Sequence, residues 1–357
     1  MSFSKLLDIR PDSIKEKLGS NSKVCLINSR DIFRNIRDEK IIIMACNTRI
    51  KHVIPGIMKA AMETDSIVAF EMAKSESDMN GGYTGMTPYD YFETIVGYAE
   101  EIGYDRPFVI HGDHLTVKTN KEEEVAATEE FIAHCLKAGY TSFALDASFN
   151  EEADNIAITS RLAKPIVEQG FGLETEVGEI KSVGAEAQIT TVEEAINFVE
   201  GIKDNGISTE LLGINNGSKH GNYFEGEEIS IDLNRTKECY DAVKKHGVCI
   251  AQHGITGTPL HLVGSFADYG IRKGNVGTHW QNVAHQHMPE DLMNEMKKWA
   301  EAEGKDIKFT TKQYFDQINS IPQKDADKII EESRKIAVEY FEAFRAVGSA
   351  KMLLEKI

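Results

Sequence analysis

Eight short apolar runs alternate with longer segments of helical periodicity along most of the chain, and this alternation restricts its fold more than any other feature. Each run has the length of a strand and is largely apolar, as expected of a strand buried on both faces of a parallel sheet. The segments between them are long enough to form the crossover helices that parallel strands need. The runs lie at 41–46, 67–70, 108–110, 143–145, 171–173, 211–214, 248–251 and 271–276.

Eight such units that close on themselves form an α/β (β/α)8 TIM barrel, which is the fold class that we predict. A doubly wound open sheet is the alternative, but it carries a Gly-x-Gly-x-x-Gly turn after its first strand. No such turn follows the run at 41–46. We predict a single barrel domain over 1–357, with an N-terminal cap at 1–40 and a helical extension at about 289–357. The extension is expected because 324–345 carries a strong 3.6-residue pattern.

The composition excludes several classes of protein. A formal net charge of −17 argues against a protein that coats nucleic acid or an anionic membrane. No apolar run approaches the roughly 20 residues of a membrane span. The five cysteines have no paired spacing and therefore indicate neither a disulfide framework nor a Cys-x-x-Cys metal site. Because the N-terminus also lacks a secretory signal, we expect a cytoplasmic protein with no nucleic-acid or membrane partner.

Histidines and carboxylates follow several of the predicted strands. Active sites of (β/α)8 barrels lie at the carboxyl ends of the strands, so these side chains are expected to converge. Three imidazoles with an open coordination position suit a catalytic divalent metal, and Zn2+ is the metal that this ligand set favours. The alternative is that each histidine only forms a hydrogen bond within its own loop. The candidate ligands are His114, His220 and His253. Asp146 and Glu176 end neighbouring strands and are expected to form an acidic second metal position or to surround the first one. The alternative for these two carboxylates is a structural salt bridge.

Glycine-rich turns follow the later strands, where barrels commonly bind phosphate through backbone N–H groups. Any one of these turns could be a plain tight turn, but their joint position favours a phosphate site. The residues that we expect to hold the phosphate are Gly221, Gly254, Thr256, Asn275 and Thr278, and Asn47, at the end of the first strand, is placed in the same substrate-binding set.

From Asn47 to Asn282, the chain resembles the class II (metal-dependent) fructose-bisphosphate and tagatose-bisphosphate aldolases. The resemblance rests on His111-Gly-Asp-His114, Leu145-Asp-Ala-Ser148, Glu174-Thr-Glu-Val-Gly178, Gly217-Ser-Lys-His-Gly-Asn-Tyr223, His253-Gly-Ile-Thr-Gly-Thr-Pro259 and Gly270-Ile-Arg-Lys-Gly-Asn275 in this order. It implies that Asp113 is the catalytic acid/base and that His114, His220 and His253 bind zinc or another divalent metal. It also implies that Asn275 binds dihydroxyacetone phosphate.

The resemblance implies reversible cleavage of a ketose (bis)phosphate, such as fructose 1,6-bisphosphate, into dihydroxyacetone phosphate and an aldehyde. It also implies a homo-oligomer, a dimer or larger. Phe224 and Gly277 replace a lysine and an aspartate of the family, and the segment 180–186, which ends in Glu186, replaces its Gly-Gly-Glu-Glu loop. The loop at 81–88 is similar to the companion subunit of tagatose-bisphosphate aldolase. A tagatose-type aldolase and a non-catalytic companion subunit therefore remain the alternatives.

Overall fold

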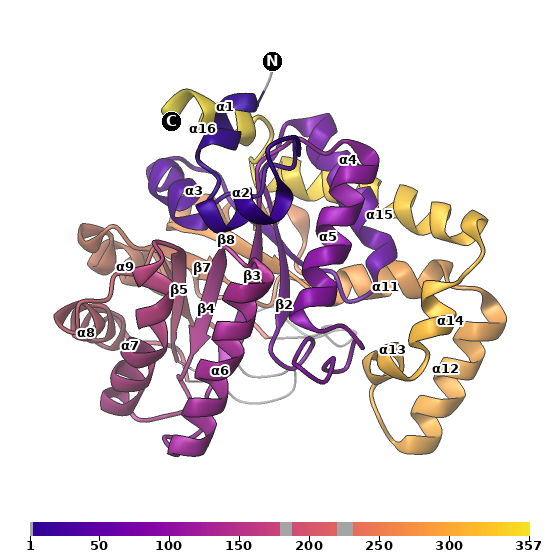
Figure 1. Ribbon diagram of the computed structural model, residues 1–357. Coiled ribbons are helices and arrows are strands. Elements are labelled where there is room, and N and C mark those ends of the chain that lie inside the picture. The colour runs from indigo at the N-terminus through magenta and orange to yellow at the C-terminus, as the bar shows by residue number, and fades with distance from the viewer. Residues whose placement is uncertain (1–2, 179–187, 220–230) are drawn as a thin grey trace.

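The computed structural model describes residues 3–178, 188–219 and 231–357. Eight parallel strands pair in chain order, and the last pairs with the first to close a barrel (Figure 1). This confirms the predicted (β/α)8 architecture and excludes the open sheet. The strands are β1 Ile43–Asn47, β2 Val68–Ala73, β3 Phe108–Thr116, β4 Ser142–Asp146, β5 Gly172–Val177, β6 Leu211–Ile214, β7 Cys249–Gln252 and β8 Ile271–Val276.

Helices join successive strands and surround the barrel. The apolar side of each helix packs on the outward side chains of the strands, and these side chains form one continuous buried cluster. The predicted segments near 232–246 and 259–268 were each too long, because a 3-10 turn ends or interrupts the α-helix in both. The helices are α4 Ile54–Thr64, α5 Pro88–Ile102, α6 Glu122–Ala138, α7 Glu152–Glu168, α8 Val192–Asp204, α9 Leu233–Val243, α10 Leu260–Val263 and α11 Thr278–His287.

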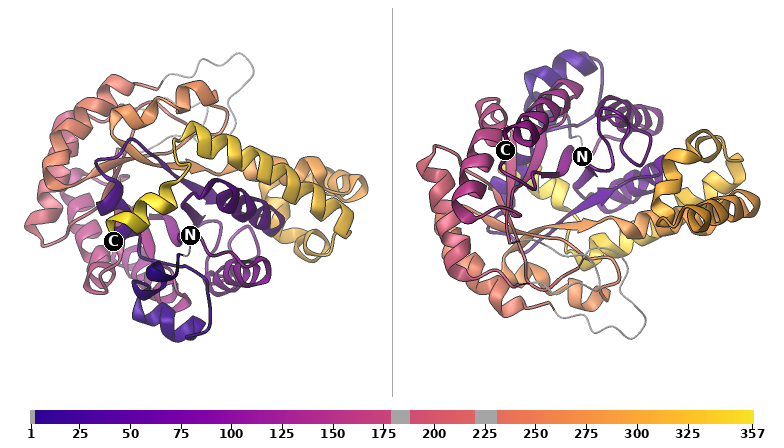
Figure 2. Two further views of the ribbon diagram at one scale, coloured as in Figure 1. Left: turned by 90° about the horizontal axis from the view of Figure 1, so that it is seen from above. Right: turned by 90° about the horizontal axis from the view of Figure 1, so that it is seen from below.

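Helices from both ends of the chain cover the amino ends of the strands. Phe3 and Leu6 are buried with Val109 of β3 and with Leu353 near the C-terminus, in a second apolar cluster. The two ends of the chain consequently lie on the same side of the barrel (Figures 1 and 2). This layer leaves the carboxyl ends of the strands as the accessible mouth. It consists of α1 Ser4–Asp8, α2 Asp12–Leu18, α3 Ser29–Ile36 and α16 Ser349–Lys356.

The chain after α11 forms the predicted helical extension, and part of it projects from the barrel (Figure 1). Its longest helix returns to pack on α4, where Gly56 permits the close approach: a Cβ there would lie 2.2 Å from the Ile330 carbonyl oxygen. None of the helices within the described ranges has the length and apolarity of a membrane span. The extension contains α12 Glu290–Glu303, α13 Thr310–Gln313, α14 Phe315–Asn319 and α15 Gln323–Ala343.

Candidate active site

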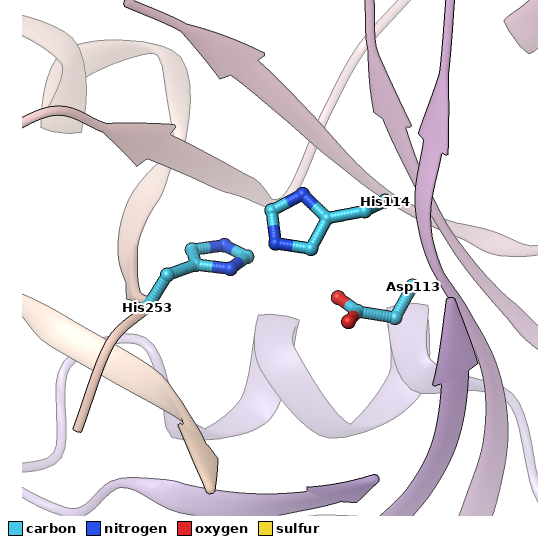
Figure 3. A group of neighbouring side chains, drawn as sticks. All are labelled: Asp113, His114 and His253. Carbon is cyan, nitrogen blue, oxygen red and sulfur yellow. The ribbon is translucent and has the colours of Figure 1, made fainter. Parts of the chain in front are cut away.

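The end of β3 presents Asp113 and His114 to the same space. Neighbouring residues of a regular strand point to opposite faces, but here the pairing of β3 with β4 shifts register between Gly112 and Leu115. His114 has a φ of 42°, in the left-handed region that non-glycine residues rarely occupy. This local distortion turns both side chains toward His253, which follows β7 (Figure 3). Backbone strain of this kind is concentrated at functional sites.

The geometry of these three side chains fits a metal ion. Their candidate ligand atoms all lie within 4.8 Å of one another, and the rings of His114 and His253 are 4.4 Å apart between centroids. Ligands at about 2.0–2.1 Å from one zinc ion lie closer together than this, so small side-chain rotations would bring the two imidazoles around one ion, with the Asp113 carboxylate beside it. The sequence also predicted His220 as a ligand, but His220 and Gly221 lie outside the described residues, as does Glu186. The backbone leading to that segment reaches the site, because a Cβ on Gly254 would meet the Lys219 carbonyl oxygen at 2.5 Å.

Two glutamates of β5 orient the two histidines. Glu176 Oε1 lies 2.7 Å from Nδ1 of His114, and Glu174 Oε1 lies 2.9 Å from Nε2 of His253. A carboxylate on one ring nitrogen sets the tautomer and directs the other nitrogen to a metal. Asp146 is more distant, with Oδ2 3.9 Å from Nδ1 of His114. Of the two predicted acidic residues, Glu176 therefore makes the closer contact with a candidate ligand.

Electrostatics at this centre favour a cation. Burial lowers the pKa of His114, but the carboxylates of Glu176 and Asp113 outweigh burial and raise that pKa well above its ordinary value. Burial likewise raises the pKa of Asp113, but the nearby His114 and Lys273 reverse the effect and hold it well below its usual range. The negative charge around the imidazoles is thus ready to be balanced by a proton or by a divalent ion, and the donor set fits zinc.

Two amides hold the carboxylate of Asp113. Asn275 Nδ2 donates to Oδ1 at 3.0 Å, and Asn47 Nδ2 donates to Oδ2 at 3.1 Å. Both asparagines were predicted to bind substrate; the structure shows that each contacts the predicted acid/base. The side-chain Oδ1 atom of Asn275 accepts from Lys273 Nζ at 2.9 Å, which fixes the amide with its NH2 group toward Asp113.

A buried ion network lies below this centre, and the sequence did not predict it. Lys273 Nζ lies 2.9 Å from Glu174 Oε2 and 3.2 Å from Glu71 Oε2, and all three side chains are at most 1% exposed. His111 is held by Ser142, and burial together with Lys273 lowers its pKa to about 3. His111 is therefore neutral. The signal available in the sequence was Lys273 within the apolar run 271–276, because a charged side chain is rarely buried without an opposite charge beside it.

A cavity of about 870 Å³ opens at the barrel mouth over this centre. Thr256 faces it from the loop after β7, and its Oγ1 accepts the backbone N–H of His279 in the first turn of α11 at 3.3 Å. Arg49 also lines the cavity. It lies two residues after Asn47 but was not among the residues predicted from the sequence. The predicted residues that the structure brings together around this cavity are Asn47, Asp113, His114, Asp146, Glu176, His253, Gly254, Thr256, Asn275 and Thr278.

Comparison with known proteins decides the family. The family model described as fructose-bisphosphate aldolase class-II matches residues 27–345. The chain belongs to this family. A fructose-bisphosphate aldolase of Giardia intestinalis is 24% identical over 267 residues, which cover 73% of this chain and 75% of that protein. The resemblance inferred from the motifs is thereby confirmed.

Two further comparisons add detail. The D-tagatose-1,6-bisphosphate aldolase subunit GatZ of Salmonella paratyphi B is 33% identical, but only over 103 residues, or 28% of this chain and 24% of that protein. The crystal structure of the YdjI aldolase from Escherichia coli K12 superposes with a TM-score of 0.66 at 18% identity, covering 91% of this chain and 99% of that chain. The latter likeness supports the barrel fold.

Proposed function

We propose that this protein is a metal-dependent aldolase that reversibly cleaves a ketose (bis)phosphate, such as fructose 1,6-bisphosphate, into dihydroxyacetone phosphate and an aldehyde. The convergence of Asp113, His114 and His253 at the barrel mouth is the observation that carries this proposal. A divalent ion, with zinc as the favoured metal, would be held by His114, His253 and His220, the last of which lies outside the described residues. When bound, it supplies Lewis-acid polarisation of the ketone.

Asp113 takes the role of acid/base in this proposal. In the cleavage direction its carboxylate accepts the proton of the C4 hydroxyl while the C3–C4 bond breaks. The electron pair of that bond remains on the ketone half, and the C4 oxygen becomes the aldehyde oxygen. Asn47 and Asn275 keep the carboxylate in place, and the lowered pKa of Asp113 keeps it ionised before the substrate reacts.

The substrate phosphate is assigned to the loops after β7 and β8. Gly254, Thr256 and Thr278 line the cavity there, and this corner commonly binds phosphate in barrels. Gly254 has a φ of 67°, a left-handed backbone conformation that glycine adopts readily and that forms the tight turn after β7. Holding the phosphate at this corner would fix the reacting carbons relative to Asp113.

Tagatose 1,6-bisphosphate is the second candidate substrate, and the likeness to GatZ supports it. Fructose and tagatose differ in configuration at C4, the carbon whose hydroxyl Asp113 would deprotonate. The test is to incubate the purified, zinc-supplied protein with each bisphosphate separately and to measure dihydroxyacetone phosphate release with a coupled dehydrogenase. We expect release from at least one of them. Release from neither would contradict the proposed activity and favour the non-catalytic companion subunit.

A further inference from the structure

The guanidinium group of Arg49 is fixed at one side of the cavity. Its Nε lies 2.6 Å from Oε1 of Glu76, and its Nη1 donates to Oε1 of Gln281 at 3.1 Å. The hydroxyl of Tyr83 donates to the same Glu76 oxygen at 2.9 Å, and the Tyr83 ring lies 5.8 Å from the centre of the guanidinium. The Arg49 side chain is therefore rigid, although it is a cavity-lining residue.

The second terminal nitrogen of Arg49 has a different environment. Among the residues that the structure describes, Nη2 makes no hydrogen bond. A Cβ placed on Gly277 would lie 3.2 Å from this nitrogen and 3.0 Å from the Asn47 Oδ1 atom. Gly277 has a φ of −108°, so glycine is not needed there for backbone conformation. Its effect is to leave out a side chain where the guanidinium edge faces the cavity.

The order of groups across the barrel mouth relates Arg49 to the substrate. Asp113 lies beside His114 and His253, and its Oδ2 atom accepts a hydrogen bond from Asn47. Asn47 Nδ2 also donates to Oε2 of Glu76 at 3.0 Å, and Glu76 holds Arg49. If the ketone lies at the metal centre and the C4 hydroxyl at Asp113, the carbons beyond C4 extend toward Asn47 and Arg49.

We propose that Arg49 determines specificity by binding an anionic oxygen, that of a phosphate, on the aldehyde half of the substrate. This inference rests on the proposed function. Arginine suits phosphate because its planar donors bind anionic oxygens with charge-assisted hydrogen bonds. The Glu76 carboxylate neutralises part of the guanidinium charge but occupies only its Nε edge. Lys308 is a second positive charge on this side of the cavity, with its Nζ 5.8 Å from the centre of the Tyr83 ring. The negatively charged Asp306 lines the cavity beside it.

The test compares two aldehydes in the synthetic direction, each with dihydroxyacetone phosphate: glyceraldehyde 3-phosphate and unphosphorylated glyceraldehyde. Wild-type protein should prefer the phosphorylated aldehyde. Arg49→Met should lower kcat/KM for glyceraldehyde 3-phosphate by about 10- to 150-fold, mainly through KM, as expected for one lost charge-assisted hydrogen bond. The value for glyceraldehyde should change less than about threefold on the same reasoning. The KM of dihydroxyacetone phosphate should rise less than that of glyceraldehyde 3-phosphate. A larger rise for dihydroxyacetone phosphate would place Arg49 at the phosphate of the ketone half, beside Gly277 and Thr278, and would overturn the assignment.

Arg49→Met leaves the buried Glu76 without its cation and could impair folding, so a second variant is needed. The double variant Arg49→Met/Glu76→Gln removes both charges and should show the same selective loss. Lys118→Met is the matched control, because Lys118 also lines the cavity but is exposed and lies over Phe149. It should leave the preference between the two aldehydes unchanged.

Each outcome has a distinct meaning. An equal loss on both aldehydes would overturn the assignment and make Arg49 a residue that shapes the cavity. A wild-type preference for unphosphorylated glyceraldehyde would also overturn it. A wild-type protein that forms no carbon–carbon bond with either aldehyde would overturn the proposed function itself, and this inference with it.

Discussion

The amide nitrogen of Asn275 lies 3.0 Å from Oδ1 of Asp113, although 162 positions separate the two residues in the chain. The other carboxylate oxygen accepts from Asn47, so residues at the carboxyl ends of β8 and β1 hold the end of β3. The position of the Asp113 carboxylate is thus defined by the closed barrel. A barrel that did not close between its last and first strands would not bring these three side chains together.

Removal of the Asp113 carboxylate should separate metal binding from turnover. Asp113→Ala leaves His114 and His253 with their β5 glutamates, so bound metal per chain should stay at the wild-type level. Turnover should fall by about 10²–10⁴-fold, the usual contribution of a positioned acid/base. Metal analysis and initial rates on the same preparation check this. Retention of more than half of the wild-type rate would require another acid/base.

Lys273 should be essential to the stability of the barrel interior. Lys273→Met leaves the fully buried Glu71 and Glu174 without their shared cation. Breaking a buried ion pair in this way typically costs about 3–5 kcal/mol in the free energy of unfolding. Urea denaturation measures the loss, and Lys273→Met/Glu71→Gln should recover part of it because the two changes are coupled. A loss below about 1 kcal/mol for the single variant would show that the network contributes little.

The barrel could be predicted because strand-length apolar runs and helical periodicity are local signals. The residues at which the strands end were harder to predict. The run at 108–110 is only the first part of β3, which continues to Thr116 through polar residues. These residues face the interior and mouth, where polar partners from other strands replace apolar packing. Glu174 and Glu176 likewise lie within β5. Apolarity alone therefore underestimates strands that carry the site.

The same limit explains which site residues were found. His114 and His253 lie at the ends of strands and were predicted from that position. Glu71 and Lys273 become meaningful only when the closed barrel places β2 and β8 on either side of β1. Arg49 was within reach, since it follows β1 by two residues, but its pairing with Glu76 depends on the loop after β2. Contacts between residues distant in sequence are what a single sequence does not display.

Thr256 should contribute to binding of the substrate phosphate. Its Oγ1 accepts the His279 N–H, which leaves the hydroxyl hydrogen able to donate to a phosphate oxygen. Thr256→Val should raise KM for a phosphorylated ketose by an amount equivalent to about 1.5–3 kcal/mol. An unphosphorylated analogue serves as the control and should bind almost unchanged. If both weakened equally, the loop would only shape the mouth of the barrel.

His285 should make the protein less stable in mild acid. Burial lowers its pKa to about 4 from an ordinary 6.5, with Asp306 opposing this effect and Lys297 and Arg49 reinforcing it. Between these values the unfolded chain binds a proton that the folded chain does not. The free energy of unfolding should therefore fall as the pH decreases through this window, by at most about 1.4 kcal/mol per pH unit.

The variant His285→Leu tests this dependence, because Nε2 of His285 is buried without a hydrogen-bond partner in the described part of the chain. Unfolding free energies at pH 7 and pH 5 should differ less for the variant than for the wild type. Identical differences would show that other groups cause the acid sensitivity.

The most direct test of the central claim is a titration of zinc into metal-depleted protein, with bound metal and dihydroxyacetone phosphate release measured on the same samples. The account predicts that release from a cleaved ketose bisphosphate rises in proportion to bound zinc and saturates near one ion per chain. His253→Ala should bind zinc at least about tenfold more weakly and lose the rate in parallel. Full activity in the metal-depleted wild type, or unchanged zinc binding by His253→Ala, would contradict it.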